Sequence, residues 1–172
     1  CSIPSAASQR KKRLDELIQG RRHPRVLIVG GGDGFGGLRQ IVLATAEALK
    51  KRDKPANLVV VCGRNADLRN QLDILLHSEA WKNTKITINI LGFVTDMHAH
   101  MARADILLTK AGPGTIAEAA ALGLPVILTN YLPGQERGNV KFVTSDFRFG
   151  QLAKRPRSAA RLVVDWFDHP QS

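Results

Sequence analysis

The sequence contains little cysteine, few aromatic residues and no long apolar run. Its two cysteines, Cys1 and Cys62, are too few for a disulfide framework, and Cys62 is expected to be a small buried hydrophobic residue. No run approaches the roughly 20 apolar residues that a membrane-spanning helix needs. The basic residues Arg10–Arg13 precede a polar stretch, so no signal peptide is indicated. Aromatic residues, 5% of the chain, do not alternate with the basic clusters as single-stranded nucleic-acid binding requires.

Positive charge, in contrast, is in excess. The chain has 25 lysines and arginines against 15 aspartates and glutamates, a formal net charge of +10. Much of this charge lies in Arg10–Arg25 and Lys154–Arg161. Such a surplus favours an anionic partner, whether nucleotide phosphates, an acidic membrane surface or nucleic acid, and it fits a merely solvated basic surface equally well. The 172 residues, 44% of them apolar, can bury the core of one domain.

Short apolar segments rich in β-branched residues alternate with segments of helical periodicity. The expected strands are Val26–Val29, Leu58–Cys62, Ile86–Leu91, Asp105–Thr109 and Pro125–Leu128. The expected helices are Ala6–Ile18, Leu38–Lys51, Ala66–His77, Thr95–Ala102, Gly114–Leu122 and Ser158–Phe167. Because the strands are almost continuously apolar, both faces of their sheet should be covered. The pattern predicts an α/β fold, a Rossmann-like parallel sheet with helices on both faces, whose ligands bind at the carboxyl ends of the strands.

The loop after the first expected strand is rich in glycine. Gly30–Gly37 reads GGGDGFGG and leads directly into a helix, an arrangement suited to binding phosphate. Gly32, Gly34 and Gly37 form the GxGxxG pattern of dinucleotide-binding proteins. The second strand, however, is followed by Arg64 and an asparagine where a dinucleotide site needs an acidic residue for the ribose. The missing acidic residue therefore counts against a dinucleotide ligand. The alternative to a phosphate site in this loop is a tight turn that binds no ligand.

The next two loops leave their roles open. Asn65 is expected to cap the following helix, whereas Arg64 fits either a ligand contact or an ordinary turn. Phe93 and Val94 follow the third strand. An aromatic ring and backbone amides at this position suit a nucleobase, and Phe93 fits the hydrophobic core equally well. His98 and His100 lie two residues apart on a helix, so they do not share a face as a metal pair would.

The segment Lys110–Glu118, KAGPGTIAE, turns from a strand into a helix. Gly112, Gly114 and the proline between them leave backbone amides at the helix N-terminus, a second candidate phosphate site to which Thr115 adds a hydroxyl. Glu118, one turn into the helix, either complements the helix dipole or accepts hydrogen bonds from the two hydroxyls of a ribose.

The loop after the fifth expected strand, Asn130–Asn139, reads NYLPGQERGN. Its amide and carboxylate at Gln135 and Glu136 suit the hydroxyls of a hexose, and an ordinary polar turn is the alternative. The chain has no GxSxG elbow, CxxC, HExxH or P-loop motif, so neither a catalytic triad nor a metal site is expected.

Together these loops resemble a known family. The segments VLIVGGGDGFGG, LGFVTDM, TKAGPGTIAEAAALGLPVIL and PGQERGNV, in this order, resemble the carboxyl-terminal domain of the monogalactosyldiacylglycerol synthases, family 28 glycosyltransferases of the GT-B fold. The resemblance implies that the chain is the UDP-sugar-binding domain of a larger enzyme. It also implies a metal-independent, inverting transfer of a hexose to diacylglycerol, with galactose as the favoured hexose. The UDP-sugar is a substrate, and no cofactor is implied. The general base is implied to lie on another domain, so this segment alone should bind UDP without transferring sugar.

The family pattern also assigns residues and surroundings. The implied substrate-binding residues are Gly32 and Gly34 at the diphosphate, Phe93 and Val94 beside uracil, Gly114 and Thr115 at phosphate, Glu118 at the ribose, and Gln135, Glu136 and Asn139 at the hexose. Arg64 and Gly112 are also expected to bind the substrate. Residues 1–24 are expected to connect a missing amino-terminal domain to a UDP-sugar-binding domain at 25–172. A lipid acceptor implies peripheral attachment to anionic membrane, and Arg10–Arg13 and Lys154–Arg157 are expected to assist it. The membrane would be a plastid envelope in a plant or alga and otherwise the cytoplasmic face of another membrane, and no nucleic-acid partner is expected.

Two other interpretations remain open. A Rossmann-type oxidoreductase would use the Gly32–Gly37 pattern to bind a nicotinamide dinucleotide and would need an acidic ribose ligand after the second strand. A non-catalytic basic module would bind anionic lipid or nucleic acid with an affinity that falls steeply with salt.

Overall fold

The structure is a computed structural model that describes residues 3–30, 37–110, 112–130, 141, 150–153 and 155–170. Its strands are β1 (Arg25–Val29), β2 (Ala56–Val61), β3 (Ile86–Leu91), β4 (Ile106–Lys110), β5 (Val126–Asn130) and β6 (Gly150–Leu152). Its helices are α1 (Ala6–Ile18), α2 (Leu38–Arg52), α3 (Ala66–Leu76), α4 (Met97–Arg103), α5 (Pro113–Leu122), α7 (Pro156–Asp168) and the short 3-10 helix η1 (Glu79–Trp81).

The strands form a single six-stranded sheet in the order β3-β2-β1-β4-β5-β6, with every neighbouring pair parallel. From β1 the chain first moves to one side, through β2 to β3, and then returns to the other side of β1 to form β4. The carboxyl ends of β1 and β4 are therefore neighbours at the point where the strand order reverses. In open α/β sheets this is where the ligand crevice lies.

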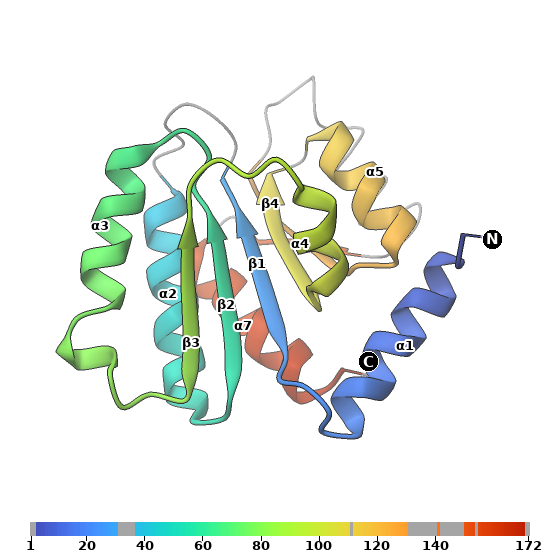
Figure 1. The fold of residues 1–172 in the computed structure, drawn as a ribbon, viewed down its shortest axis with the longest axis horizontal. Coiled ribbons are helices and arrows are strands. Elements are labelled where there is room, and N and C mark those ends of the chain that lie inside the picture. Colours follow the sequence, from blue (N-terminus) through green and yellow to red (C-terminus); the bar gives the residue numbers. More distant parts are fainter. Residues whose placement is uncertain are drawn as a thin grey trace.

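Each strand sends alternate side chains to opposite faces, and both faces are covered at the centre of the sheet, whereas the edge strand β3 leaves Thr87 and Asn89 exposed. In β1, Val26 and Ile28 pack into one core with α2, α3 and α7, while Leu27 packs into a second core with α4 and α5. Figure 1 shows these two helical layers, with α1 lying beside α5 at the edge of the second. All three β1 side chains are almost fully buried, each worth about 1.5–3 kcal/mol of transfer free energy. The predicted Rossmann-like fold is thus confirmed.

The expected elements match the observed ones to within a few residues at each end. Two short elements, η1 and β6, were not expected from the sequence. The strand β6 has only three residues, Gly150–Leu152, and pairs in parallel with β5. Its glycine and glutamine carry no β-branched or apolar signal, so pairing with a neighbour that is already buried determines its extended backbone.

The amino-terminal helix α1 is tied to the end of α5. The guanidinium of Arg13, 8% exposed, donates hydrogen bonds to the carbonyl oxygens of Leu122 and Gly123 at 2.8 and 2.9 Å. Arg22, after α1, pairs with Asp105 and with Glu16. The two bonds from Arg13 satisfy carbonyls that the C-terminus of α5 leaves without helical partners. Residues 1–24 thus include a helix packed on the sheet domain, and their assignment as a connector stays a prediction.

Candidate functional site

The N-terminus of α5 is open at the reversal point of the sheet. Gly112 is the N-cap residue, with extended backbone and no side-chain capping bond, and Pro113 occupies the first helical position. Proline has no N–H, so the free donors of this first turn are the amides of Gly114 and Thr115. Gly114 is exposed and Thr115 is half-buried. Two aligned amides and the positive end of the helix dipole form a site for an anion.

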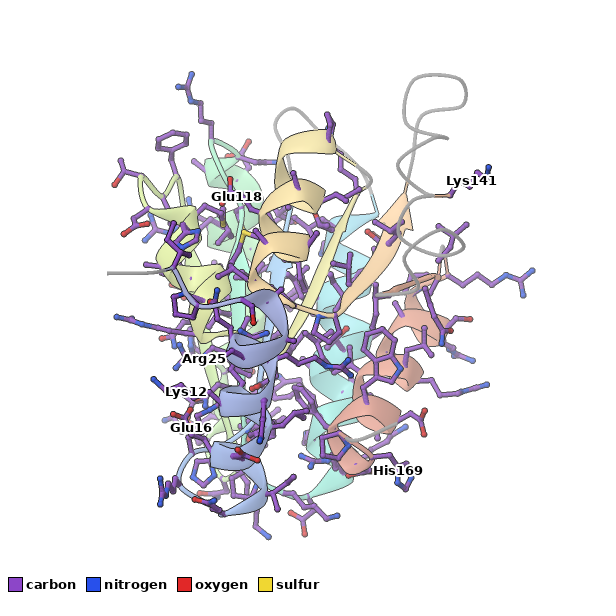
Figure 2. The ribbon with its side chains drawn as sticks, turned by 90° about the vertical axis from the view of Figure 1, so that its right-hand side faces the viewer. Lys12, Glu16, Arg25, Glu118, Lys141 and His169 are labelled. Atoms are coloured by element: carbon purple, nitrogen blue, oxygen red, sulfur yellow. The ribbon has the colours of Figure 1, made fainter. Side chains whose placement is uncertain are left out.

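Glu118 lies on the same side of α5 as these amides. Residues three and four apart share a helix face, which places Glu118 with Gly114 and Thr115, while Ile116 and Ala119 turn into the core. The Glu118 side chain is 48% exposed. Figure 2 shows it toward the end of the molecule where the strands finish, far from Glu16 and His169 at the opposite end. A ligand phosphate at the helix N-terminus therefore has a carboxylate acceptor one turn away.

The loops after β2 and β3 bring Arg64 and Phe93 together. The Arg64 guanidinium lies over the Phe93 ring, with 5.2 Å from its central carbon to the ring centroid. Phe93 is 63% exposed, so the alternative that it belongs to the core is wrong. The pair forms an exposed aromatic and cationic surface at the carboxyl edge of the sheet, of the kind on which a nucleobase stacks.

The backbone next to this pair is held in place locally. Gly63 has φ +59°, a left-handed conformation that favours glycine and turns the chain sharply after β2. Asn65 then caps α3 as expected, because its side-chain oxygen accepts the Leu68 N–H at 3.1 Å. Val94, in contrast, is half-buried, with its side chain packed against the second core.

The contact between His98 and Glu118 was missed by sequence reasoning. His98 on α4 places its Nδ1 3.9 Å from Oε2 of Glu118 on α5. The two residues are 20 positions apart on different helices. No spacing rule within one element could find the pair, because it depends on how α4 and α5 pack on the sheet.

Several expected site residues cannot be placed. Gly32, Gly34, Gln135, Glu136 and Asn139 lie outside the described residues, and their roles stay predictions. Arg64, Phe93, Gly114, Thr115 and Glu118 all lie on the loops or helices that follow the carboxyl ends of the strands.

Within the described ranges, no three histidine, cysteine, aspartate or glutamate side chains lie close enough to hold a metal ion. Over the same ranges, no helix is long and apolar enough to cross a membrane. Cys62 is 1% exposed, and burial raises the pKa of its thiol, in keeping with the expected buried hydrophobic role.

A cavity of about 600 Å³ lies elsewhere in the fold, between α1, the start of β4 and the end of α7. Leu14, Leu17, Ile106 and Trp166 contribute apolar surface, and Arg10 and Asp165 contribute charge. The residues that line it belong to the amino-terminal ends of the strands and to the flanking helices. The cavity therefore contains none of the expected site residues.

The amino-acid sequence matches that of a known protein family. Residues 25–144 match the model of the glycosyltransferase family 28 C-terminal domain. Monogalactosyldiacylglycerol synthase 3, chloroplastic, from Arabidopsis thaliana is 39% identical over 171 residues, covering 98% of this chain and 35% of that protein. A probable monogalactosyldiacylglycerol synthase 3 from Oryza sativa subsp. japonica is 45% identical over 147 residues, covering 84% of this chain and 27% of that protein. The chain thus spans between 27% and 35% of the length of these curated relatives.

Solved structures share the fold. MurG of Acinetobacter baumannii superposes with a TM-score of 0.65 at 25% identity, covering 89% of this chain and 44% of that one. Anabaena Alr3699/HepE, solved in complex with UDP and glucose, superposes with a TM-score of 0.62 at 19% identity, covering 99% of this chain and 44% of that one. In both, the matched part is less than half of the solved chain. Because the family model matches residues 25–144 and the two curated relatives are 39% and 45% identical over most of the chain, the chain belongs to the glycosyltransferase family 28 C-terminal domains.

Proposed function

We propose that this chain is the donor-binding half of a galactolipid-forming glycosyltransferase. It binds a UDP-sugar, and UDP-galactose is the favoured donor. A longer enzyme that contains this chain transfers the hexose to diacylglycerol without a metal ion. The observation that carries the proposal is the open N-terminus of α5 with Glu118 on the same face. The galactose and diacylglycerol assignments are supported by the names of the curated relatives.

Different residues of the site bind the phosphate, the ribose and the uracil of the nucleotide. The amides of Gly114 and Thr115 bind a phosphate of UDP, and the Glu118 carboxylate accepts hydrogen bonds from the ribose hydroxyls. The exposed ring of Phe93 and the backbone of Val94 hold the uracil. By family resemblance, Gly32 and Gly34 lie beside the diphosphate, and Gln135, Glu136 and Asn139 bind the hexose.

The same amides contribute to the chemical step. In an inverting transfer, the acceptor oxygen bonds to the anomeric carbon as the bond to the diphosphate oxygen breaks, so negative charge develops on the leaving UDP. Backbone N–H groups already aimed at that phosphate stabilise the charge without reorganising. The acceptor hydroxyl must also lose a proton to a base, which we assign to the remainder of the longer enzyme.

The UDP site is tested by calorimetry on the 172-residue chain. UDP should bind in the micromolar to millimolar range, and Glu118→Ala should weaken binding by about 1.5–3 kcal/mol, the value of hydrogen bonds to a charged acceptor. Glu79→Ala is the matched control, since Glu79 is a well-exposed carboxylate paired with Lys82 on η1. No heat of UDP binding at millimolar concentration, with the fold intact by circular dichroism, would refute the proposal. Tight binding of NAD would instead favour an oxidoreductase.

Transfer is tested separately. The isolated chain should release no UDP from UDP-galactose in the presence of diacylglycerol vesicles, whereas a longer polypeptide that includes the acceptor domain should. Turnover by the isolated chain would place the base on this half and overturn that part of the proposal.

We also propose peripheral attachment to anionic membrane, of the plastid envelope in a plant or alga, which the chloroplastic names of the relatives support. Arg10, Lys11 and Lys12 are exposed on α1, whereas Arg13 is buried in its bonds to α5 and does not contribute. Sedimentation with vesicles should rise with phosphatidylglycerol content and fall when these three residues are changed to glutamine. Sedimentation that is indifferent to anionic lipid would refute this part.

A further inference from the structure

Helix α4 connects the loop proposed to bind the base with the helix proposed to bind the ribose. It begins shortly after Phe93, and Asp96 fixes its start by accepting the Ala99 N–H at 3.1 Å. His98 is the second residue of the helix. The α4 helix packs against α5, so the first turn of α4 faces the side of α5 that carries Glu118.

The contact between the two side chains forms at a surface that a ligand can reach. Nδ1 of His98 lies 3.9 Å from Oε2 of Glu118, with the two side chains 64% and 48% exposed. Core packing therefore does not fix either group. At this distance the contact is not yet a hydrogen bond, and a small rotation of either side chain would make it one.

The chemistry of the pair is complementary to a ribose. An ionised carboxylate has about four lone-pair positions, so two ribose hydroxyls and an imidazole N–H can share it. The terminal torsion of a free glutamate is broad, and a binding site must order it when the ligand arrives. A neighbour that restricts this torsion beforehand removes part of that cost.

We infer that His98 is a positioning residue, which holds the Glu118 carboxylate in the orientation that receives the ribose hydroxyls. The inference rests on the proposed function, because it concerns the same nucleotide site. It assigns to His98 no contact with the sugar being transferred and no proton in the reaction.

A double-mutant cycle on UDP affinity tests the inference. Calorimetry compares the 172-residue chain with His98→Ala, Glu118→Ala and the double variant. His98→Ala should weaken UDP binding about three- to tenfold, the effect of ordering one side chain on binding rather than beforehand. In the Glu118→Ala background, the same change should have no effect. His98→Gln, which keeps an N–H donor, should restore most of the affinity.

Two controls separate positioning from general damage to the helix. His100→Ala removes an imidazole from the same helix two positions away, off the His98 face, and should leave UDP affinity unchanged. 2′-Deoxyuridine diphosphate lacks one of the two ribose hydroxyls that Glu118 is proposed to bind. With this ligand, His98→Ala should therefore reduce the binding affinity by a smaller factor than it does with UDP.

The outcomes distinguish this inference from the proposed function. If Glu118→Ala weakens UDP binding and His98→Ala does not, the inference fails and the function stands. Equal His98→Ala penalties with and without Glu118 would show that the two residues act independently, which also overturns the inference. If the unaltered chain does not bind UDP, both fail.

Discussion

Replacing Arg13 by alanine is expected to destabilise the protein by about 3 kcal/mol and to free α1 from α5. The guanidinium of Arg13 is 8% exposed and donates two hydrogen bonds, at 2.8 and 2.9 Å, to the carbonyls of Leu122 and Gly123. These bonds tie α1 to the C-terminal end of α5. The N-terminal end of α5 forms the candidate phosphate site.

The magnitude follows from opposing contributions. Each bond from a charged donor is worth about 1.5–3 kcal/mol, and the cation also lies at the negative end of the α5 dipole, worth about 0.3–1 kcal/mol. Burying a guanidinium offsets part of this gain, and that burial, opposed in part by Asp105, lowers the pKa of Arg13. A net loss of about 3 kcal/mol corresponds to a fall in Tm of roughly 6–12 °C for a domain of this size.

Urea unfolding followed by circular dichroism measures the decrease in the free energy of unfolding. Hydrogen exchange read by mass spectrometry shows which segments lose protection. Amides of α1 should exchange much faster in the variant, while those of β1 and β4 should retain relative protection. Arg10→Ala, an exposed arginine on the same helix, is the matched control and should cost less than about 0.5 kcal/mol. An Arg13→Ala variant as stable as Arg10→Ala would refute the account of α1 as a helix held by this side chain.

Three further predictions follow from the same structure. Gly123→Ala should cost about 1–3 kcal/mol in urea unfolding, because Gly123 has φ +61° and a Cβ there would clash with the Ala6 carbonyl oxygen. Asp168 bonds to Arg52, which holds the pKa of its carboxyl below the ordinary value. The pair therefore stabilises the fold above about pH 4 and loses this effect as pH falls through the lowered pKa, so the roughly 0.5–1 kcal/mol gap between wild type and Asp168→Asn should close in acid. Phe93→Ala should weaken UDP binding by about 1–3 kcal/mol and barely change stability; the reverse result would return Phe93 to the core.

Much of the fold follows from local pattern. The nearly continuous apolar runs at Val26–Val29 and Leu58–Cys62 predict buried parallel strands, because only a sheet covered on both faces hides both sets of side chains. Asn65 is recognisable as a cap because its side chain bonds within three residues of itself. The strand β6 is the opposite case, since its extended backbone comes from pairing with β5 rather than from its own residues.

The site is divided in the same way. KAGPGTIAE specifies a strand, a turn and an open helix N-terminus by itself, and with the glutamine and glutamate loop it indicates the family. Whether Phe93 was core or surface could not be read from its neighbours along the chain, and packing left it exposed beneath Arg64. Val94, the next residue, is half-buried against the second core.

Residues that act within one helix or turn are therefore readable from the chain, because their partners lie three or four positions away. The contacts of His98 with Glu118 and of Arg13 with Leu122 join residues 20 and 109 positions apart. They exist because β1 pairs with β4, which brings α4, α5 and the amino-terminal helix to one face of the sheet. Strand order of this kind depends on how the whole core is buried, and no local pattern of residues encodes it.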